Sequence, residues 1–354
     1  MKRSFCMVVI VAVTALFLGM RSVSALDYYV DNVRGNDAND GLSDAKPFKT
    51  IRKAVPLLKP GDKLYLTKNA TPYYENLRFV NHSGTKEKPI EVDGRGAVLN
   101  GSPAIDPAKW HTEGNNRFSV PLDIPKFGQT RFFVLFDGKM VRMSSCGKGG
   151  VRLVFKAPAD LAANEWTWIE AEKKLYISLP EGKTPSTAKI AFPEYTYESG
   201  VLLAGKSSWL TFRNLTTENF VNDGYNIHQE CYNVKFYNIR ALYNGDDGIS
   251  AHENCTIEVD GFYAEGNATG ICHVQECECI HRNVICKNAA GIELFFLNKK
   301  NVLENFTVES TAIRPCTVTR GELIMKNGKI IYRSGKKIFD NRAEKSTIEN
   351  VTID

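Results

Sequence analysis

The chain has 354 residues, of which 43% are hydrophobic and 24% are charged, and its formal net charge is +5. This balance excludes a disordered chain and supplies enough apolar material for a large core. The mild positive charge is not gathered into a Lys/Arg tract, so it does not indicate a nucleic-acid partner, although it would suit an anionic polysaccharide.

The first 25 residues differ in character from the rest of the chain. Lys2 and Arg3 precede the apolar run FCMVVIVAVTALFLG, and small side chains follow at Val23 and Ala25. This pattern predicts a signal peptide cleaved after Ala25, and hence a secreted or periplasmic protein that has no membrane contact after cleavage. An uncleaved amino-terminal anchor is the alternative, but the run is shorter than the roughly 18 residues of a membrane span.

The segment after the signal peptide contains YYVDNVRGNDANDGLSDAKPFKTIRKAVPLLKPGDKLYL (28–66) and SGTKEKPIEVDGRGAVLNGS (83–102). It strongly resembles the amino-terminal coils of secreted β-helix proteins of the pectate-lyase-like superfamily. The resemblance implies an exposed loop rich in Gly, Asn and Asp, a short capping helix at KPFKTIRKAV, and a first core strand at PGDKLYL. A cap is physically reasonable because an open coil end exposes strand edges and apolar core.

Residues 105–200 do not follow the pattern of the later repeats. The stretches RFSVPLDIPKFGQTRFFVLFDGKMVRM and NEWTWIEAEKKLYISLPEG have paired aromatics and turn residues, which are typical of antiparallel hairpins. We expect a small antiparallel β subdomain inserted beside the coil. The EWTW segment (165–168) is interpreted as core of this subdomain rather than as a platform for sugars.

From Trp209 onward the chain repeats with a period of 22–24 residues. Each repeat holds short alternating apolar segments bounded by Gly, Asn and Asp, which predicts strands stacked in a parallel coil. A leucine-rich repeat has a similar period, but its leucine signature is missing. Stacked asparagines at an inward-pointing bend would bond to one another from coil to coil. The aligned column contains Asn214, Asn238, Gly261, Asn283, Asn305, Asn327 and Asn350.

These patterns predict an all-β fold, namely a right-handed parallel β-helix with an amino-terminal capping helix and an inserted antiparallel β subdomain. We expect a monomer. The predicted segments are a signal peptide (1–25), the cap and first coils (26–104), the insert (105–200) and the later coils (201–354).

Eight cysteines remain after the predicted cleavage, and seven of them fall within residues 231–316. CHVQECECIH (272–281) could bind zinc through Cys277, Cys279 and His281, but the spacing matches no common zinc module. Cysteines on stacked coils are close enough for a disulfide. We therefore expect a buried cysteine ladder or disulfides rather than a metal site.

Two similar stretches, VNDGYNIHQEC (221–231) and YNGDDGISAHENC (243–255), bring polar side chains to one side of the coil. Strand alternation points Ser250 and His252 outward if Ile249 and Ala251 point inward. Turn aspartates beside glycine are often structural, but a doubled aspartate exceeds the needs of a turn, and like charges on adjacent coils repel unless a cation or substrate joins them. The first predicted outward column contains Asn226, Ser250, Cys272, Glu293 and Arg314. The second contains His228, His252, Val274, Phe295 and Cys316. Asp223, Asp246 and Asp247 lie in the turns that precede these columns.

The resemblance implies two chemistries for this surface. In a lyase, carboxylates hold a calcium ion that acidifies the C5 proton of a uronate, and a Lys or Arg removes that proton. Arg314 would be this base, with Lys287 or Arg282 as alternatives. Calcium is the one cofactor suggested, and its expected ligands are Asp223, Asp246, Asp247 and Glu293.

In a hydrolase of the polygalacturonase kind, NDG (222–224) and GDDG (245–248) resemble the first two motifs in order and spacing. The third motif is ATGICH (268–273), which has Thr269 where the family has histidine. An inverting pair of carboxyl groups would be about 6.5–9.5 Å apart.

The sequence therefore predicts a carbohydrate-active β-helix protein that cleaves an acidic polysaccharide by β-elimination. The alternatives are an inverting glycoside hydrolase and a non-catalytic glycan-binding or surface structural module. The predicted catalytic residues are Asp223, Asp246, Asp247, His252 and Arg314, and the predicted substrate-binding residues are Asn226, His228, Ser250, Glu293 and Lys287.

Overall fold

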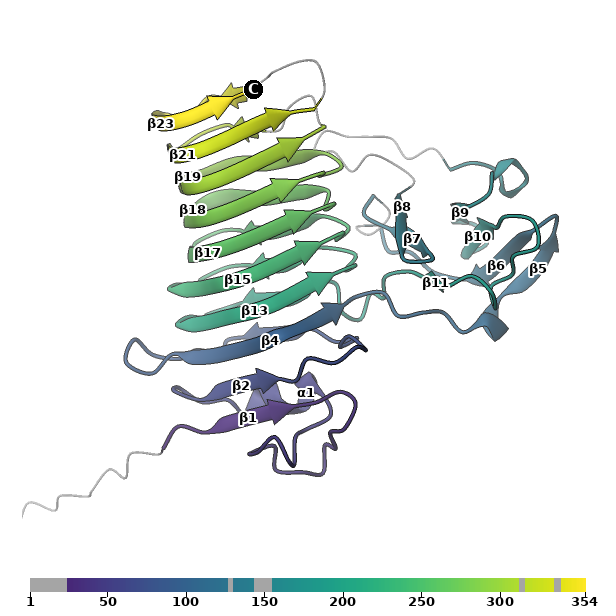
Figure 1. Ribbon diagram of the computed structural model, residues 1–354, viewed down its shortest axis with the longest axis horizontal. Helices are drawn as coiled ribbons and strands as arrows, with labels where there is room; N and C mark the ends of the chain where they lie inside the picture. The colour runs from purple at the N-terminus through teal and green to yellow at the C-terminus, as the bar shows by residue number, and fades with distance from the viewer. Residues whose placement is uncertain (1–23, 127–129, 143–154, 312–315, 334–338) are drawn as a thin grey trace, which may run out of the picture.

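The computed structural model describes residues 24–126, 130–142, 155–311, 316–333 and 339–354. It confirms the predicted right-handed parallel β-helix with a capping helix and an antiparallel insert (Figure 1). The predicted signal peptide falls on residues 1–25, nearly all of which lie outside the described residues. Within the described part of the chain, none of the helices has the length and apolar character needed to cross a membrane.

The coil is built from two stacks of parallel strands, which join where β18 and β19 each run through both stacks. In stacking order, the first stack contains β1 (Asp27–Val30), β2 (Lys63–Leu66), β4 (Ile90–Asn100), β13 (Leu210–Glu218), β15 (Val234–Leu242), β17 (Thr256–Glu265), the second half of β18 (Thr269–Lys287), the second half of β19 (Ile292–Ser310), β21 (Glu322–Tyr332) and β23 (Lys345–Ile353). The second stack contains β3 (Leu77–Val80), β12 (Val201–Ala204), β14 (Tyr225–Ile227), β16 (Asp247–Ala251), the first halves of β18 and β19, β20 (Cys316–Val318) and β22 (Phe339–Asn341).

The interior of the coil is filled by apolar side chains that repeat at the same position from coil to coil. Phe79 packs edge-on against Phe212 at 5.5 Å between ring centroids, and Phe212 stacks on Phe236 at 5.3 Å. All three side chains are fully buried. Strand alternation gives each coil this inward set, so the register of stacking follows from the apolar pattern.

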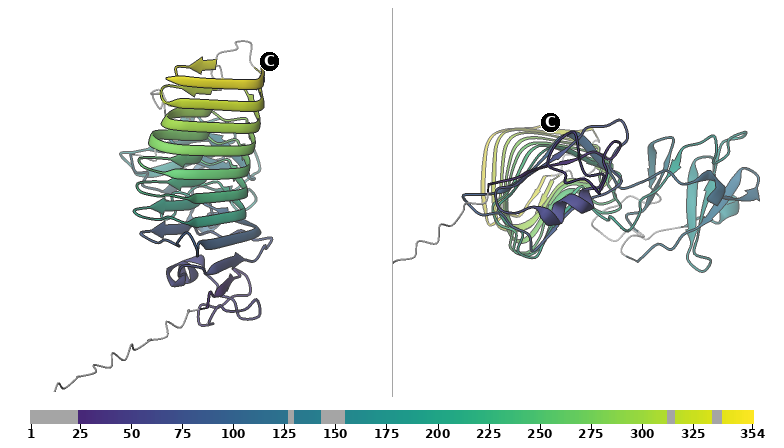
Figure 2. Two further views of the ribbon diagram at one scale, coloured as in Figure 1. Left: turned by 90° about the vertical axis from the view of Figure 1, so that its left-hand side faces the viewer. Right: turned by 90° about the horizontal axis from the view of Figure 1, so that it is seen from below.

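The amino-terminal end of the coil is closed by helix α1 (Ile51–Ala54) and the short 3-10 helix η1 (Val55–Leu57), which lie across the coil when it is seen from below (Figure 2). Thr50 caps α1, because its side chain accepts a hydrogen bond from the backbone N–H of Lys53 at 3.2 Å. Ile51 and Ala54 of this helix are buried and belong to the core of the coil. The predicted capping helix is therefore present at the expected place.

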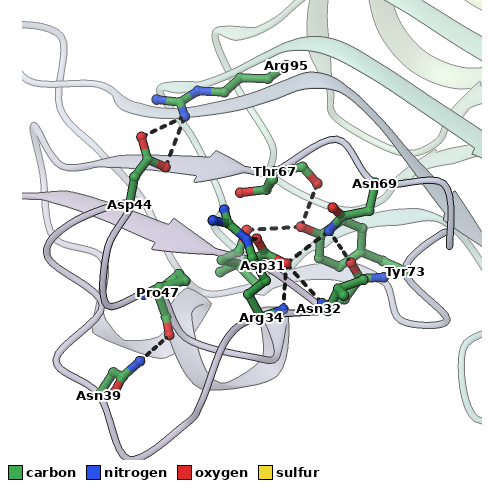
Figure 3. A network of polar contacts seen from close by, with 12 residues as sticks. Asp31, Asn32, Arg34, Asn39, Asp44, Pro47, Thr67, Asn69, Tyr73 and Arg95 are labelled. Carbon is green, nitrogen blue, oxygen red and sulfur yellow. Dashed lines mark hydrogen bonds and ion pairs between the residues drawn. The ribbon is translucent and has the colours of Figure 1, made fainter.

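The loop between β1 and α1 is organised by one buried carboxylate, Asp31 (Figure 3). Asp31 accepts hydrogen bonds from the backbone N–H groups of Val33 and Arg34 and from the Asn69 amide, and it pairs with the Arg34 guanidinium at 2.8 Å. Burial by itself would raise the pKa of Asp31, but these hydrogen bonds hold it below its usual value. The polar loop is anchored at its base even though many of its side chains are exposed.

The asparagine column forms a ladder, but on the outside of the coil. Asn238 Nδ2 donates to Asn214 Oδ1 at 2.9 Å, and Asn350 Nδ2 donates to Asn327 Oδ1 at 3.2 Å, in solvent-exposed positions. The expectation that these side chains lie at an inward-pointing bend was wrong. All seven positions have positive φ, between 50° and 79°, and this left-handed conformation is what selects Asn or Gly there.

Replacing Asn238 with alanine is expected to lower the free energy of unfolding by about 1–2 kcal/mol, because alanine is strained at φ 50° and the bond to Asn214 is lost. Asn238→Gly keeps the conformation at low cost and should lose no more than about 1 kcal/mol. Chemical denaturation of both variants measures the difference. Equal stability of Asn238→Ala and the unsubstituted protein would contradict this account of the ladder.

The cysteines form a buried ladder. The thiols of Cys231, Cys255 and Cys277 stack in successive coils, and each donates to the carbonyl three residues earlier, at 3.0, 2.9 and 2.7 Å. No disulfide joins any two of the seven described cysteines, so the disulfide alternative is not supported; Cys146 lies outside the described residues.

The zinc alternative is not supported by the side chains around His281. His281 Nε2 lies 2.8 Å from His273 Nε2 in the core, and burial lowers the pKa of His281 to about 3. Among the described residues, the one group of three or more side chains whose metal-binding atoms lie close together consists of three aspartates, and no cysteine or histidine belongs to it.

The insert contains two antiparallel sheets beside the coil, at the ends of the first-stack strands (Figures 1 and 2). Trp166 and Trp168 are buried in its own core and donate to the carbonyls of Val141 and Leu122, which confirms that EWTW is core. One sheet has β5 (His111–Gly114), β6 (Arg117–Pro121), β10 (Lys174–Ser178) and β9 (Glu165–Ile169), and the other has β11 (Ile190–Ala191), β7 (Phe133–Phe136) and β8 (Lys139–Arg142).

Candidate active site

Three aspartates converge where the turns of two adjacent coils lead into the second stack. Asp223 precedes β14, and Asp246 and Asp247 lie one coil later, at the start of β16. One carboxylate oxygen from each of the three lies within 4.8 Å of the others. We name this group the aspartate cluster. It follows directly from the stacking, because the Asp247 backbone N–H donates to Asp223 Oδ1 at 3.0 Å.

The aspartate cluster is largely buried, and this burial favours the protonated form of Asp223. Asp223 and Asp247 are each only 2% exposed, whereas the Asp246 side chain is 16% exposed. Burial, with the nearby charge of Asp246, raises the pKa of Asp223 to about 6, although the Ser250 hydroxyl donates to Asp223 Oδ2 at 2.7 Å and favours the ionised form. The cluster can therefore carry a proton at mildly acidic pH, and it meets solvent at Asp246.

Two arginines of the insert hold the turns of this site. The Arg131 guanidinium pairs with Asp246 Oδ2 at 2.8 Å. Arg142, at the end of β8, donates to the carbonyls of Asn244, Gly245 and Gly266, which lie in the turns of two successive coils. Sequence reasoning missed both arginines, because they lie in the insert outside the repeat and no motif marks them.

Two asparagines and a serine extend the site by one coil. Asn222 and Asn226 each donate through Nδ2 to Ser199 Oγ, at 3.2 and 3.4 Å. All three residues are at least 91% buried, and the two Oδ1 atoms have no hydrogen-bond partner among the described residues. Both oxygens are buried beside the aspartate cluster with unused capacity to accept a hydrogen bond. Asn226 was predicted, while Ser199 and Asn222 were not.

The register of the first predicted column is correct over three coils and is wrong from the fourth coil onward. Asn226 pairs with Ser250, and Ser250 pairs with Cys272, but Cys272 pairs with Phe295. All of the first three are buried. The prediction aligned Gly270 with Gly291, whereas the backbone of Glu293 stacks on Gly270, so the step is 23 residues instead of 21.

Glu293 is therefore not part of the aspartate cluster, which corrects its predicted roles in calcium and substrate binding. It is fully buried, and its Oε1 accepts a hydrogen bond from the Ala289 backbone at 2.7 Å. Burial raises the pKa of Glu293 to about 7. The nearby ionisable groups are the thiols of Cys286 and Cys316 and the carboxylate of Glu309.

The second predicted column is correct for its first members. The rings of His228 and His252 stack at 4.2 Å between centroids, and Val274 follows in register. These histidines lie at the opposite end of their strands from the aspartate cluster, and Glu253 pairs with His228 at 3.2 Å. The structure therefore does not place His252 in the aspartate cluster.

The remaining members of the second column were placed wrongly. Leu297, not Phe295, pairs with Val274, and Cys316 is a core residue that pairs with Leu294. The same error in step length explains both misplacements.

The cations predicted as lyase bases are not at the aspartate cluster in the described residues. Lys287 pairs with Glu265 at 3.6 Å in the first stack. Arg282 pairs with Glu258 and Glu304 in that stack. Arg314 lies outside the described residues.

The donor set of the aspartate cluster suits a hard cation, since calcium is bound by carboxylate and other oxygens. Without Glu293 the cluster offers three carboxylates, and Arg131 already contributes one positive charge to Asp246.

One comparison with known structures supports this architecture. No family model matches the chain. An 85-residue stretch, 23% of the chain, is 31% identical to a lacto-N-biosidase of Bifidobacterium longum subsp. longum and spans only 5% of that protein. A solved glycoside hydrolase superposes with a TM-score of 0.58 at 11% identity, covering 93% of this chain and 97% of that one. A solved pectate lyase has a TM-score of 0.45 at 13% identity, covering 94% of this chain and 78% of the other. The likeness to the glycoside hydrolase extends over nearly all of both chains and supports the β-helix fold.

Proposed function

We propose that this protein hydrolyses glycosidic bonds of an acidic polysaccharide at the aspartate cluster. The observation that carries the proposal is the group of three carboxyls within 4.8 Å, in which burial raises the pKa of Asp223 to about 6 while Asp246 reaches solvent. Glycoside hydrolysis needs one protonated and one ionised carboxyl beside the bond that breaks. Like charges this close do not all ionise, so the cluster provides both states at mildly acidic pH.

The residues of the cluster have different parts in this mechanism. Asp246 is the exposed member and contacts the glycosidic bond, and Arg131 keeps it in place and neutralises its charge. The proton retained by the cluster passes to the leaving oxygen as the bond to the anomeric carbon breaks. An ionised carboxylate on the other side stabilises the positive charge that develops on the sugar ring and bonds to the anomeric carbon. Water then displaces this carboxylate, giving its hydroxyl group to the sugar and its proton to the cluster.

The spacing bears on the stereochemistry of the reaction. One oxygen from each of the three carboxylates lies within 4.8 Å of the others, which is below the roughly 6.5–9.5 Å of an inverting pair and closer to the roughly 5–5.5 Å of a retaining pair. The inverting arrangement expected from the sequence is therefore less well supported than retention. NMR of the first anomer released distinguishes the two outcomes.

The direct test uses the chain without residues 1–25 on polygalacturonate, pectin and xylan, with added calcium or with EDTA. We expect new reducing ends on the acidic polymers, no absorbance from unsaturated products, and no loss of rate in EDTA. If neither reducing ends nor unsaturated products form while the protein still binds glycan, hydrolysis is contradicted and a non-catalytic glycan-binding module is favoured.

The second candidate is the calcium-dependent lyase, which the three-carboxylate donor set favours. Asp223, Asp246 and Asp247 would hold the ion, which when bound supplies charge neutralisation of a uronate and acidification of its C5 proton. In the described part of the chain, Arg131 is the guanidinium next to these carboxylates and would be the base. Unsaturated products that form only with calcium would support this candidate over hydrolysis.

A further inference from the structure

A second column of left-handed residues lies next to the aspartate cluster. One residue directly after each of β13, β15, β17 and β18 has positive φ, at the point where the chain turns toward the second stack. The residues of this column are Asn219 (58°), Tyr243 (52°), Gly266 (70°) and Asn288 (57°).

Tyr243 is the exception in this column. Asn and Gly adopt positive φ at low cost, whereas an aromatic residue is strained there. The Tyr243 side chain is 41% exposed, so burial in the core does not compensate for the strain. Strain that packing does not explain is typical of a functional position.

The neighbouring coil leaves room for the Tyr243 ring. A Cβ added at Gly266 would lie 2.3 Å from Tyr243 Cδ1, so only glycine allows the ring to lie over the next turn. Tyr243 is therefore held in a defined place even though much of its surface faces solvent.

The exposed ring borders a cleft of about 550 Å³ between the β7–β8 hairpin of the insert and the turns of the coil. Its lining includes two cations, Lys139 and Arg142. The neighbouring Glu265 carboxylate is hydrogen-bonded to Tyr243 and Asn288 and is neutralised by Lys287 at 3.6 Å. Lys139 makes no ion pair within the described ranges. The cleft adjoins the aspartate cluster, because Arg142 bonds to the carbonyl of Gly245, the residue before Asp246.

We propose that this cleft is a sugar subsite, in which a uronosyl ring stacks on Tyr243 and its carboxylate binds Lys139. An aromatic face covers the apolar face of a sugar ring, and an ammonium group suits an exposed carboxylate. The inference rests on the proposed function, because it places this sugar next to the bond that the aspartate cluster cleaves.

The test measures binding by calorimetry in an Asp223→Asn background, so that ligands are not cleaved. The probes are tetragalacturonate and xylotetraose, and the variants are Tyr243→Asn, Tyr243→Gly, Tyr243→Phe and Lys139→Gln. Asparagine and glycine occupy the same column in neighbouring coils, so the Tyr243→Asn and Tyr243→Gly variants should be at least as stable as the unsubstituted protein. Thermal unfolding of each variant checks this.

Both Tyr243→Asn and Tyr243→Gly should bind tetragalacturonate about tenfold more weakly, and Tyr243→Phe should stay within about threefold. Lys139→Gln should weaken tetragalacturonate alone and remove part of the salt dependence. Unchanged affinity in Tyr243→Asn and Tyr243→Gly, or a marked loss of stability in both, would overturn the subsite. Equal binding of the two probes would overturn its acidic specificity.

This experiment separates the subsite from the proposed function. Binding that depends on Tyr243 in a protein that cleaves nothing supports the subsite and refutes hydrolysis. Cleavage by the Tyr243→Asn variant with unchanged KM supports hydrolysis and refutes the subsite.

Discussion

Asp223→Asn should lower kcat by about 10³- to 10⁴-fold on the acidic polymer that the protein cleaves, because it removes the group that retains a proton in the aspartate cluster. The amide has the shape of the carboxyl and can still accept from the Asp247 backbone N–H, so the fold should be preserved. Initial rates, with thermal unfolding of the same sample, measure the effect.

The pH profile of kcat provides an independent check. Because the pKa of Asp223 is raised to about 6, the protonated form is lost as the pH rises through that value. We therefore expect kcat to fall with rising pH around pH 6. Ser250→Ala removes a hydrogen bond that favours the ionised carboxylate of Asp223, so the fall in kcat should move to higher pH. A matched control is Asp260→Asn, which changes a half-buried aspartate beside the asparagine ladder, in the first stack, and should leave kcat unchanged. Full activity of Asp223→Asn would exclude the cluster as the catalytic centre.

Between about pH 4.5 and pH 7 the free energy of unfolding should fall by about 3 kcal/mol because of Glu293. Burial raises the pKa of this carboxyl from its ordinary value of 4.5 to about 7, and each pH unit over that interval corresponds to about 1.4 kcal/mol. The folded state binds more protons than the unfolded chain in this range, so stability is fully present below about pH 4.5 and is lost as the pH rises through 7. Denaturation by urea at several pH values measures the slope.

Glu293→Gln should make that slope shallower, because glutamine is neutral at every pH and keeps an acceptor for the Ala289 backbone N–H. The slope that remains up to about pH 6 comes from Asp223, whose pKa is also raised in the folded state. Above pH 7 this variant should be more stable than the unsubstituted protein. Glu304→Gln is the matched control, since Glu304 is partly exposed and paired with Arg282 at the surface, and it should leave the slope as it is. An unchanged slope in Glu293→Gln would show that another group governs the pH dependence.

The aspartate cluster was partly predictable. Asp223 and Asp247 recur at one position of a 24-residue step, and stacked coils bring such positions together. The added carboxylate of Asp246 was recognisable for the same reason. Glu293 was misplaced because the next step is 23 residues, and an error of two residues along a chain that is about to turn moves a side chain from the surface to the interior.

The sequence by itself determined the coil, because the same pattern of apolar and turn residues repeats every 22–24 residues. Alternating apolar side chains define the inside, and Asn238 and its equivalents supply the left-handed conformation. Only the tertiary structure brought Arg131 to Asp246 and the β7–β8 hairpin to Tyr243, since these contacts join the insert to coils far along the chain and depend on how two separate cores dock. Periodicity carries no information about such docking, so the repeat revealed the scaffold and the carboxylates, while the packing of the insert decided the surroundings of the site.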